Sequence, residues 1–263
     1  MSSSAESTRG AALREAPSYD GVGASELASR LGVPSVLVYG EVSSTLDIAH
    51  RVAPTVAAGT LILADTQTAG RGRHGRRWTS PAGAGVWLTL VERPTDARAL
   101  DVLALRCGLY AAEALDALAG ERVALKWPND LLVRGCKLAG ILIETRWRGT
   151  APEWVAIGFG INVSAPAVQT ATGLRAGATR VAALDAVVPA LRRAASASRH
   201  LDPSELARWT SRDIAGGRAV VAPSDGTVQG ISADGELCIR VTDGHITRHR
   251  TGSITFADPL TCS

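Results

Sequence analysis

Residues 153–163 constrain the fold more than any other segment, because their side chains alternate between two kinds of position. Large apolar residues occupy every second position: Val155, Ile157, Phe159 and Ile161. Two glycines and an amide occupy the other face: Gly158, Gly160 and Asn162. A period of two predicts a strand with one face in a hydrophobic core and the other face bare. The bare face serves either close packing of another element or an open floor for a ligand, and the segment alone favours neither.

A second feature, residues 70–77, contains four arginines, three glycines and one histidine, and it runs directly into Trp78. A guanidinium group offers a planar set of donors that matches carboxylate and phosphate oxygens. Glycines between the arginines let the backbone approach a ligand closely. We interpret the segment as a clamp for a small ligand with two anionic groups. The alternative is a disordered Arg/Gly tail that binds nucleic acid through its phosphates.

Composition limits that alternative. The chain has 263 residues, 46% hydrophobic and 20% charged, and a net charge of only +3, so its basicity is local to residues 71–77. Such a chain is not a strongly basic nucleic-acid binder. No apolar run approaches the roughly 18 residues that a membrane span needs. The cysteines show no metal-binding spacing and predict neither zinc nor a disulfide framework, which favours a reducing, cytoplasmic setting. They are Cys107, Cys136, Cys238 and Cys262.

The Arg/Gly segment is expected to lie between two strands. The elements expected around it are a helix over 25–31, a strand over 36–41, a helix over 45–52 capped by Ser44, and strands over 60–64 and 85–91. These follow from capping residues, from Gly and Pro stops, and from short β-prone apolar runs. A loop held by a strand at each end is a poor candidate for a disordered tail.

The rest of the chain predicts the fold class. Further elements are expected as a helix over 96–119, strands over 122–127, 131–133, 137–145 and 153–163, and helices over 181–198 and 203–212. Strands followed by helices that pack on them predict an α+β fold, a mixed β-sheet with helices on one face.

The two ends of the chain differ from this pattern. Asp-Gly pairs recur every nine residues from Asp225 to Gly244 and predict hairpins in a small β-meander or barrel over 217–256. The start is rich in Ser, Ala and charged residues and lacks the apolar run of a secretory signal. We expect a flexible N-terminal tail over 1–23, a main domain over 24–214 and a small C-terminal domain over 215–263.

Lys137 begins a strand in which Ala139, Ile141 and Ile143 would share its face. A lysine on an apolar face needs either an anionic partner or a route by which its ammonium reaches water. The second option, a lysine at a strand end that extends to solvent, is a purely structural explanation. Proximity to an anion-binding loop favours the first.

Residues 126–130, Lys-Trp-Pro-Asn-Asp, bring a lysine, an amide and a carboxylate together around a tight turn. Turn chemistry alone explains Asn129 and Asp130. The functional alternative is that Asp130 binds a metal or orients a lysine while Asn129 contacts a base, since Mg²⁺ needs only one or two carboxylates beside phosphate oxygens.

Other polar residues are ambiguous when taken singly. Helix capping explains Ser44, Gln67 is exposed by default, and His74 has no Ser or Cys placed as a nucleophilic partner. The chain contains no P-loop and no dinucleotide-binding glycine motif. Each of these signals is weak alone, and only the set as a whole carries weight.

Taken in order, these segments resemble the biotin–protein ligase family from about residue 36 to the end. The segments that carry the resemblance are Ser44-Thr45, Gln67, GRGRHGRRW (70–78), KWPND (126–130), KLAGILIE (137–144) and GFGIN (158–162). The resemblance implies a class II synthetase-like catalytic domain with a small SH3-like C-terminal β-barrel. It also implies a two-step reaction, in which biotin and ATP give biotinyl-5′-AMP, and the biotin then passes to a lysine of a biotin carboxyl carrier protein or domain.

The resemblance also implies roles for single residues. Those assigned to biotin are Ser44, Thr45, Gln67, Gly70, Arg71, Gly72, Arg73, Lys137 and Gly140. Those assigned to ATP are Arg73, Arg76, Trp78, Lys126, Asn129 and Asn162. The catalytic group is Arg73, Lys137 and Asp130, with Asp130 also the candidate Mg²⁺ ligand. No tightly bound prosthetic group is expected, and ATP, Mg²⁺ and biotin act as substrates and ion.

Two departures qualify the resemblance. Family members often have Asn after the Ser-Thr pair, whereas this chain has Leu46 followed by Asp47. Some relatives carry an N-terminal DNA-binding repressor domain, and the 35 residues before the first main strand are too few for one, so we expect a ligase without repressor function. A lipoate ligase or octanoyltransferase is the alternative enzyme, but its R-R-x-x-G-G-G type motif is absent. We expect no DNA or membrane partner and leave monomer or homodimer open.

Overall fold

A seven-stranded mixed sheet forms the centre of the computed structural model, which describes residues 15–197 and 199–262. Strands β3 and β4 are parallel, and the other neighbouring pairs are antiparallel. This confirms the expected α+β fold with a mixed sheet. In spatial order the strands are β3 (Val36–Val42), β4 (Thr60–Gln67), β5 (Gly85–Glu92), β9 (Ala151–Asn162), β8 (Cys136–Arg148), β7 (Asp130–Val133) and β6 (Ala124–Lys126).

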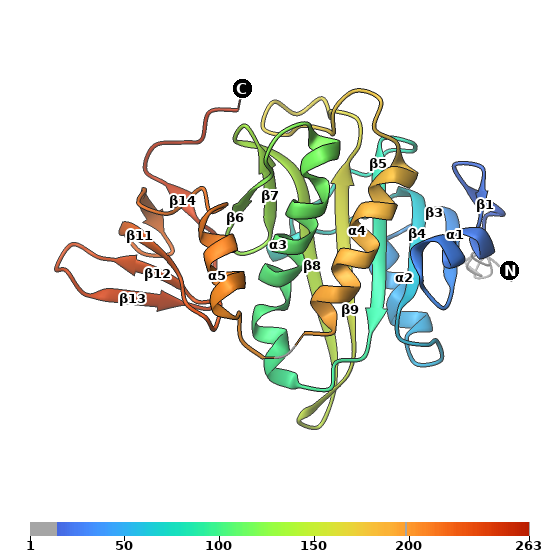
Figure 1. Cartoon of the computed structure of the whole chain (residues 1–263), viewed down its shortest axis with the longest axis horizontal. Coiled ribbons are helices and arrows are strands. Elements are labelled where there is room, and N and C mark those ends of the chain that lie inside the picture. The colour runs from blue at the N-terminus through green and yellow to red at the C-terminus, as the bar shows by residue number, and fades with distance from the viewer. Residues whose placement is uncertain (1–14, 198, 263) are drawn as a thin grey trace, which may run out of the picture.

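Three helices cover one face of this sheet: α1 (Ala24–Leu31), α3 (Leu100–Ala119) and α4 (Arg180–Ala195). Figure 1 shows α3 and α4 in front of the strands. The expectation of helices on one face is wrong for α2 (Thr45–Val52), whose Leu46, Ile48 and Ala49 pack on the opposite face. The short helix η2 (Ala97–Ala99) leads into α3, and α5 (Pro203–Thr210) follows α4.

The alternation in β9 has the predicted consequence. Its four large apolar side chains belong to the main core beneath α3 and α4. On the other face, a methyl group placed on Gly158 would lie 3.1 Å from Leu46 Cδ1 of α2, and one on Gly160 would lie 2.7 Å from Trp78 Cε2. The glycine face therefore receives α2 at one end and the Arg/Gly loop at the other, so both explanations of the bare face apply.

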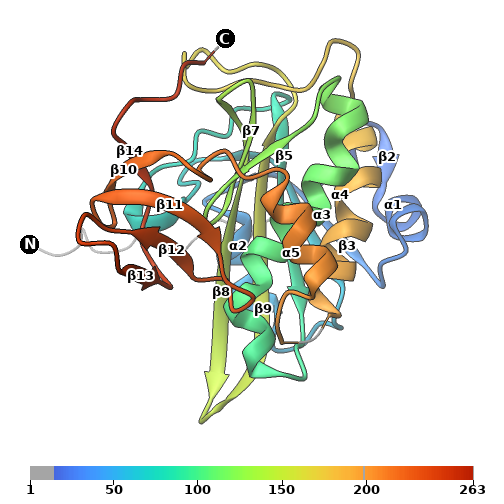
Figure 2. The same ribbon diagram turned by 60° about the vertical axis from the view of Figure 1, so that its left-hand side comes forward.

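The C-terminal region forms a five-stranded antiparallel sheet in the order β13-β12-β11-β10-β14. In Figures 1 and 2 this sheet (orange to red) lies beside the β6 and β7 end of the larger sheet. Its strands are β10 (Ala219–Ala222), β11 (Gly226–Ile231), β12 (Leu237–Arg240), β13 (Ile246–His249) and β14 (Thr255–Phe256). The Nε1–H of Trp127 donates to the Gly235 carbonyl oxygen at 3.0 Å, which joins the two sheets directly.

The expected N-terminal tail over 1–23 is wrong from Glu15 onward, while residues 1–14 lie outside the described part of the chain. Strands β1 (Ser18–Tyr19) and β2 (Val22–Gly23) form a small hairpin. Tyr19 is only 2% exposed, and the Arg180 guanidinium lies 4.4 Å from its ring centroid. A buried aromatic ring anchors this segment, a contact that its polar composition concealed.

Candidate functional site

A cavity of about 610 Å³ lies on the glycine face of the sheet, opposite α3 and α4. Its volume falls within the range of about 300–1,000 Å³ that small-molecule sites occupy. Among the described lining residues, six are cationic and Asp130 alone is anionic. The six are Arg71, Arg73, Arg76, Arg77, Lys126 and Lys137. This imbalance suits a ligand with more than one negative charge.

One end of the cavity is polar but uncharged. Thr45 is 3% exposed; its N–H donates to Gln67 Oε1 at 2.9 Å, and its Oγ1 accepts from Thr89 at 2.9 Å. The Gln67 Nε2–H donates to Ser80 Oγ at 2.8 Å, which fixes the orientation of the amide. Ser44 is 1% exposed and caps α2, with its Oγ accepting from the Leu46 N–H at 3.3 Å. The predicted Ser44, Thr45 and Gln67 are thus brought together.

The Arg/Gly segment connects β4 to β5, as predicted, and contains the short helix η1 (Arg73–Gly75). Its ends are pinned together, since the Trp78 N–H donates to the Gly70 carbonyl at 2.9 Å and the Gly72 N–H to the Arg76 carbonyl at 2.7 Å. A methyl group on Gly70 would lie 2.5 Å from the Trp78 carbonyl oxygen, so glycine is sterically required there. The segment is an ordered hairpin-like loop over the cavity.

The arginines of this loop point to different partners. Arg73 is half-buried and donates to the Gly252 carbonyl at 3.1 Å and to Asn129 Oδ1 at 3.4 Å, and burial lowers the pKa of its guanidinium. Arg71 pairs instead with Asp47 and Glu144. Arg77 donates to the Thr68 carbonyl at 2.9 Å. Arg73 is therefore the loop arginine held most directly over the interior of the site.

Trp78 lies on the glycine floor between the loop and the sheet. Methyl groups on Gly140 and Gly160 would lie 3.3 Å and 2.7 Å from its ring atoms. Its ring meets that of Trp87 edge-on at 6.3 Å, and its Nε1–H is buried without a partner among the described residues. A buried donor with no partner costs free energy unless a ligand satisfies it. This donor lies against the backbone of Gly160, so the indole ring covers the glycine floor.

Lys137 does not share the apolar face of Ala139 and Ile141, contrary to expectation. Leu131 pairs with Ala139 but Leu132 pairs with Lys137, so Leu138 is an extra residue in β8 and reverses the alternation. The Lys137 ammonium lies 2.7 Å from Asp130 Oδ1 and 5.2 Å from the Trp78 ring centroid. A β-bulge thus places this lysine on the ligand face.

Asp130 is therefore the partner of a lysine, one of the two functional roles considered for it. No group of three or more His, Cys, Asp or Glu side chains within the described ranges is arranged to hold a metal ion. Mg²⁺ prefers six oxygen ligands and keeps several of them from water or phosphate. Asp130 fits as one protein oxygen ligand to a metal–nucleotide complex, not as a complete site.

The remaining predicted residues lie at the Lys137 side of the cavity. Lys126 has its ammonium 5.1 Å from the Phe256 ring centroid, and burial lowers its pKa, an effect that Asp130 partly opposes. The Asn129 amide donates to the Ile141 carbonyl at 2.7 Å. The Asn162 amide donates to the carbonyls of Thr172 at 3.1 Å and Lys137 at 3.4 Å. Both amide nitrogens thus hold the backbone in place.

Several lining residues were not predicted. Phe256 of β14 lines the cavity and contacts Lys126, and Gly252, before β14, accepts from Arg73 without lining the cavity itself. Gly252 lies 179 residues from Arg73 in the chain, and no local pattern could have paired them. Leu46 and Leu142 line the apolar part of the cavity, and their apolar character was the only available signal.

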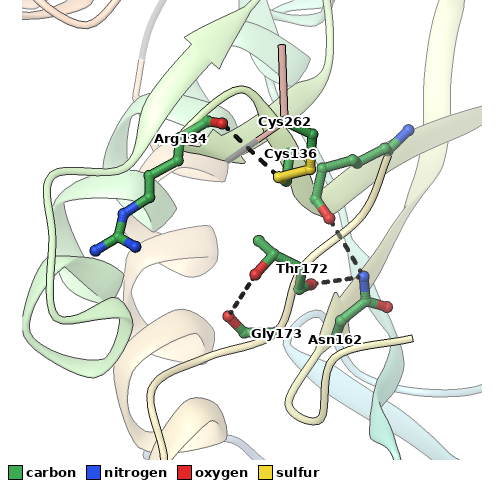
Figure 3. The surroundings of a disulfide bond; sticks show 7 residues. Arg134, Cys136, Asn162, Thr172, Gly173 and Cys262 are labelled. Carbon is green, nitrogen blue, oxygen red and sulfur yellow. Dashed lines mark hydrogen bonds between the residues drawn. A yellow bond between two sulfur atoms is a disulfide. The ribbon is translucent and has the colours of Figure 1, made fainter. Parts of the chain in front are cut away.

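A disulfide joins Cys136 to Cys262, which corrects the expectation that the cysteines form none. Their Cα atoms lie 4.8 Å apart although 126 positions separate them in the sequence, so spacing gave no indication. Cys107 and Cys238 are free. Figure 3 shows the bond together with Asn162, whose amide donates to the carbonyls of Lys137, the residue after Cys136, and of Thr172. The C-terminal segment is thereby tied to the start of β8.

No helix within residues 15–197 and 199–262 is long and apolar enough to cross a membrane.

Known proteins resemble this chain in sequence. The biotin/lipoate A/B protein ligase family matches residues 41–162. The biotin–[acetyl-CoA-carboxylase] ligase of Mycobacterium tuberculosis is 34% identical over 205 residues, 70% of this chain and 74% of that protein. The bifunctional ligase/repressor BirA of Bacillus subtilis is 42% identical over 131 residues, 49% of this chain. The chain spans 40–46% of the length of the BirA proteins that it matches.

Solved structures agree in fold. The biotin protein ligase from Aquifex aeolicus in complex with biotin and ATP superposes with a TM-score of 0.66 at 26% identity. The superposition covers 84% of this chain and 97% of that one. The motifs that suggested the family lie around one cavity, and the Mycobacterium tuberculosis relative is matched over most of its length. The chain belongs to the biotin–protein ligases of the biotin/lipoate A/B protein ligase family.

Proposed function

We propose that this protein is an ATP-dependent biotin–protein ligase. The observation that carries the proposal is the cavity itself, with an uncharged polar end at Thr45 and Gln67 and a cationic end at Arg73 and Lys137, above a floor of glycines. Biotin has a matching shape, a polar ring system at one end and a carboxylate at the other. ATP supplies the second anionic group that the cations would meet.

In the first step a biotin carboxylate oxygen attacks the α-phosphorus of ATP. The bond between the α-phosphorus and the bridging oxygen breaks, pyrophosphate leaves, and biotinyl-5′-AMP remains. Arg73 and Lys137 would neutralise the charge that builds up where carboxylate and phosphate meet, in a site already partly shielded from water. Asp130 would hold the Lys137 ammonium at that point, given their 2.7 Å ion pair.

In the second step the amine of an acceptor lysine attacks the biotinyl carbonyl carbon, AMP leaves, and an amide bond forms. The loop over residues 70–78 would shield the adenylate from hydrolysis until the acceptor arrives. Mg²⁺ would bind with ATP, with Asp130 as a protein ligand and charge neutralisation of the phosphates as its contribution.

The site assignments follow the same division. Gly70, Gly72 and Gly140 would let the backbone approach biotin. Arg76, Trp78, Lys126 and Asn129 would contact the nucleotide, and Asn162 would act by holding the backbone of Lys137. Residues 24–214 would form the catalytic domain and residues 215–263 the small SH3-like domain.

We further propose that the acceptor is the carrier protein or domain of a biotin-dependent carboxylase, and that the reaction takes place in the cytoplasm. Two relatives support this, because their names identify biotin–[acetyl-CoA-carboxylase] ligases. Glu15 and Ala16 bridge the outer edge of β3 at Tyr39 and Val38, and a homodimer would use the rest of that edge.

Biotin-dependent ATP–pyrophosphate exchange tests the proposal. We expect exchange with biotin and none with lipoate, the substrate of the alternative enzyme. Lys137→Ala should lower exchange by about 100-fold, the usual cost of losing a charge contact in a transition state. Exchange only with lipoate, or normal exchange by a folded Lys137→Ala variant, would contradict the proposal.

A further inference from the structure

The side chain of Arg71 pairs with two carboxylates from different elements. Its Nη1–H donates to Asp47 Oδ1 in the first turn of α2, and its Nη2 lies 3.5 Å from Glu144 Oε1 in β8. We call these three residues the Arg71 clasp. Asp47 is the residue that follows Leu46, where the chain departs from the family pattern.

Both carboxylates are themselves positioned by neighbours. The Ser43 hydroxyl donates to Asp47 Oδ2 at 2.6 Å. Glu144 also contacts His50 Nε2, and the His50 ring lies edge-on to Trp154 at 5.0 Å between centroids. The clasp therefore has a defined geometry although its side chains are 28–37% exposed.

The clasp residue Arg71 lies between two glycines whose positions are fixed by contacts within the loop. Gly70 is confined by the Trp78 carbonyl, and Gly72 is bonded to Arg76, so fixing Arg71 between them fixes the whole turn. Two residues further on, Arg73 reaches Gly252 and Asn129 over the cavity. With its guanidinium between two carboxylates, Arg71 is poorly placed to receive a third from biotin.

We propose that Asp47 and Glu144 are positioning residues, which hold the loop over the cavity through Arg71 so that Arg73 and the turn's backbone reach the ligand. The kinetic consequence of this proposal rests on the proposed ligase function, whereas the ordering of the loop does not. It revises the role expected for the Arg71 side chain, from biotin ligand to loop anchor.

Trypsin measures the loop order without any substrate, because four of its cleavage sites lie in residues 71–77. We expect the Asp47→Asn/Glu144→Gln variant to be cut in this loop at least five-fold faster than wild type. Asp185→Asn is the matched control, since it removes an exposed ion pair with Arg30 far from the cavity, and it should be cut at the wild-type rate. Equal loop cleavage in the double variant and wild type overturns the proposal.

Steady-state kinetics distinguish a positioning role from a general loss of structure. The double variant should raise KM for biotin five- to ten-fold in pyrophosphate exchange and leave kcat within two-fold. Arg71→Gln should have a similar effect, and combining all three changes should add little, as expected for residues that act as one unit. Additive losses overturn the proposal. A wild-type protein that exchanges with no acid would refute the proposed function instead, and the trypsin result would still stand.

The disulfide between Cys136 and Cys262 holds the C-terminal segment beside the start of β8. Cys136 is 5% exposed and immediately precedes Lys137, whereas Cys262 is exposed. Pro259 and Leu260, just before Cys262, line the cavity. A methyl group on Gly135 would lie 2.4 Å from the Thr261 carbonyl oxygen, so the segment lies directly on the turn before β8.

We infer that this bond is a reducible strap that controls ligand release from the Lys137 side of the cavity. A thiolate of a dithiol reductant attacks the exposed Cys262 sulfur, the S–S bond breaks, and Cys136 leaves as a thiolate that takes up a proton. The second thiol of the reductant then displaces the Cys262 thiol and forms its own disulfide. With the strap free, Pro259 and Leu260 no longer close this wall.

The test compares ATP dissociation before and after treatment with dithiothreitol, with thiols counted under denaturing conditions. Oxidised wild type should show two thiols and release ATP at least five-fold more slowly than the reduced protein. Cys262→Ser should release ATP at the fast rate under both conditions, and Cys238→Ser should behave as wild type. Four thiols before reduction, or equal release rates after a gain of two, overturn the inference. Failure to bind ATP at all would refute the proposed function.

Discussion

The two faces of β9 belong to the same strand and behave as opposites. On the helix-covered face, Ile157 is fully buried among side chains of α3, α4 and the neighbouring strands. On the other face, Gly158 and Gly160 have no side chains, and Leu46 and Trp78 approach the backbone itself. One face holds the fold together by filling space, and the other creates a site by leaving space empty.

Stability and binding thus depend on alternate residues of the same strand. Substitutions on the filled face should lower the free energy of unfolding and change binding little. Substitutions on the empty face should weaken binding and change the free energy of unfolding little, because an added side chain there fills open space and removes no packing contact.

The largest effect is expected from Ile157→Ala on the filled face. Truncating a fully buried Ile removes apolar contacts and leaves a cavity, which costs about 3–4 kcal/mol of unfolding free energy. Urea unfolding measures this, and biotin affinity of the folded fraction should stay within about two-fold. A loss of affinity larger than the loss of stability would break the separation.

Glu205 and its partner Arg106 are charged exceptions among the described buried residues on the helix-covered side of the sheet. Glu205 is 3% exposed and accepts from Arg106 Nε at 2.8 Å and from the Tyr110 hydroxyl at 2.6 Å. Burial alone would raise the pKa of Glu205, but these hydrogen bonds outweigh it and lower the pKa from 4.5 to about 2. The stabilisation is therefore present above pH 4.5 and is lost as the pH falls towards 2.

We expect Glu205→Gln to lose about 3 kcal/mol at pH 7, which is the free-energy equivalent of that pKa difference. Its unfolding free energy should also vary less than that of wild type between pH 4.5 and 2. Unfolding in urea across this range is the measurement. Parallel pH profiles for the two proteins would show that the carboxylate contributes nothing through its ionisation.

Gly160→Ala should have the largest effect on the empty face. Its methyl group would lie 2.7 Å from Trp78 Cε2, so the indole must leave the floor and shift the end of the loop. We expect about a 100-fold loss of kcat/KM for adenylate formation, about 2.7 kcal/mol, with stability changed by less than 1 kcal/mol. Full activity in a variant whose tryptophan fluorescence shows that Trp78 has moved would contradict the role of the floor.

Gly140→Ala should give the smallest effect of these variants and is the milder comparison for Gly160→Ala. Its methyl group would lie 3.3 Å from both Lys137 Cε and Trp78 Cζ3, a contact that flexible side chains relieve by a few tenths of an ångström. A loss of about five-fold in kcat/KM, or about 1 kcal/mol, is expected. A loss greater than that of Gly160→Ala would show that the Lys137 position, not the Trp78 position, dominates.

Much of the fold could be predicted because its signals are local. The alternation in β9, the Ser44 cap and the Asp-Gly turns each depend on residues within one element. The side of the sheet that α2 covers is not such a signal, since a short amphipathic helix fits either face. The anchoring of Tyr19 by Arg180, 161 positions away, was equally hidden.

Which residues would lie near one another was predicted better than how their side chains are arranged. Ser44, Thr45, Gln67, Arg73, Lys137 and Trp78 all line one cavity, as their motifs indicated. The face of Lys137 was wrong because one extra residue in β8 reverses a period-two pattern without leaving a trace in composition. The partners of Arg71 and Arg73 come from elements far along the chain, and only the folded structure brings them together.

The bond between Cys136 and Cys262 has a consequence for the unfolded chain. It closes residues 136–262 into a covalent ring that contains β8, β9, both late helices and the whole C-terminal sheet. Even when every native contact is lost, this half of the oxidised chain cannot extend fully, and the entropy gained on unfolding is smaller. Chain-entropy arguments put the resulting stabilisation at about 4–5 kcal/mol for a ring of roughly this size. Oxidised and reduced protein should thus differ in the size of their denatured states as well as in stability.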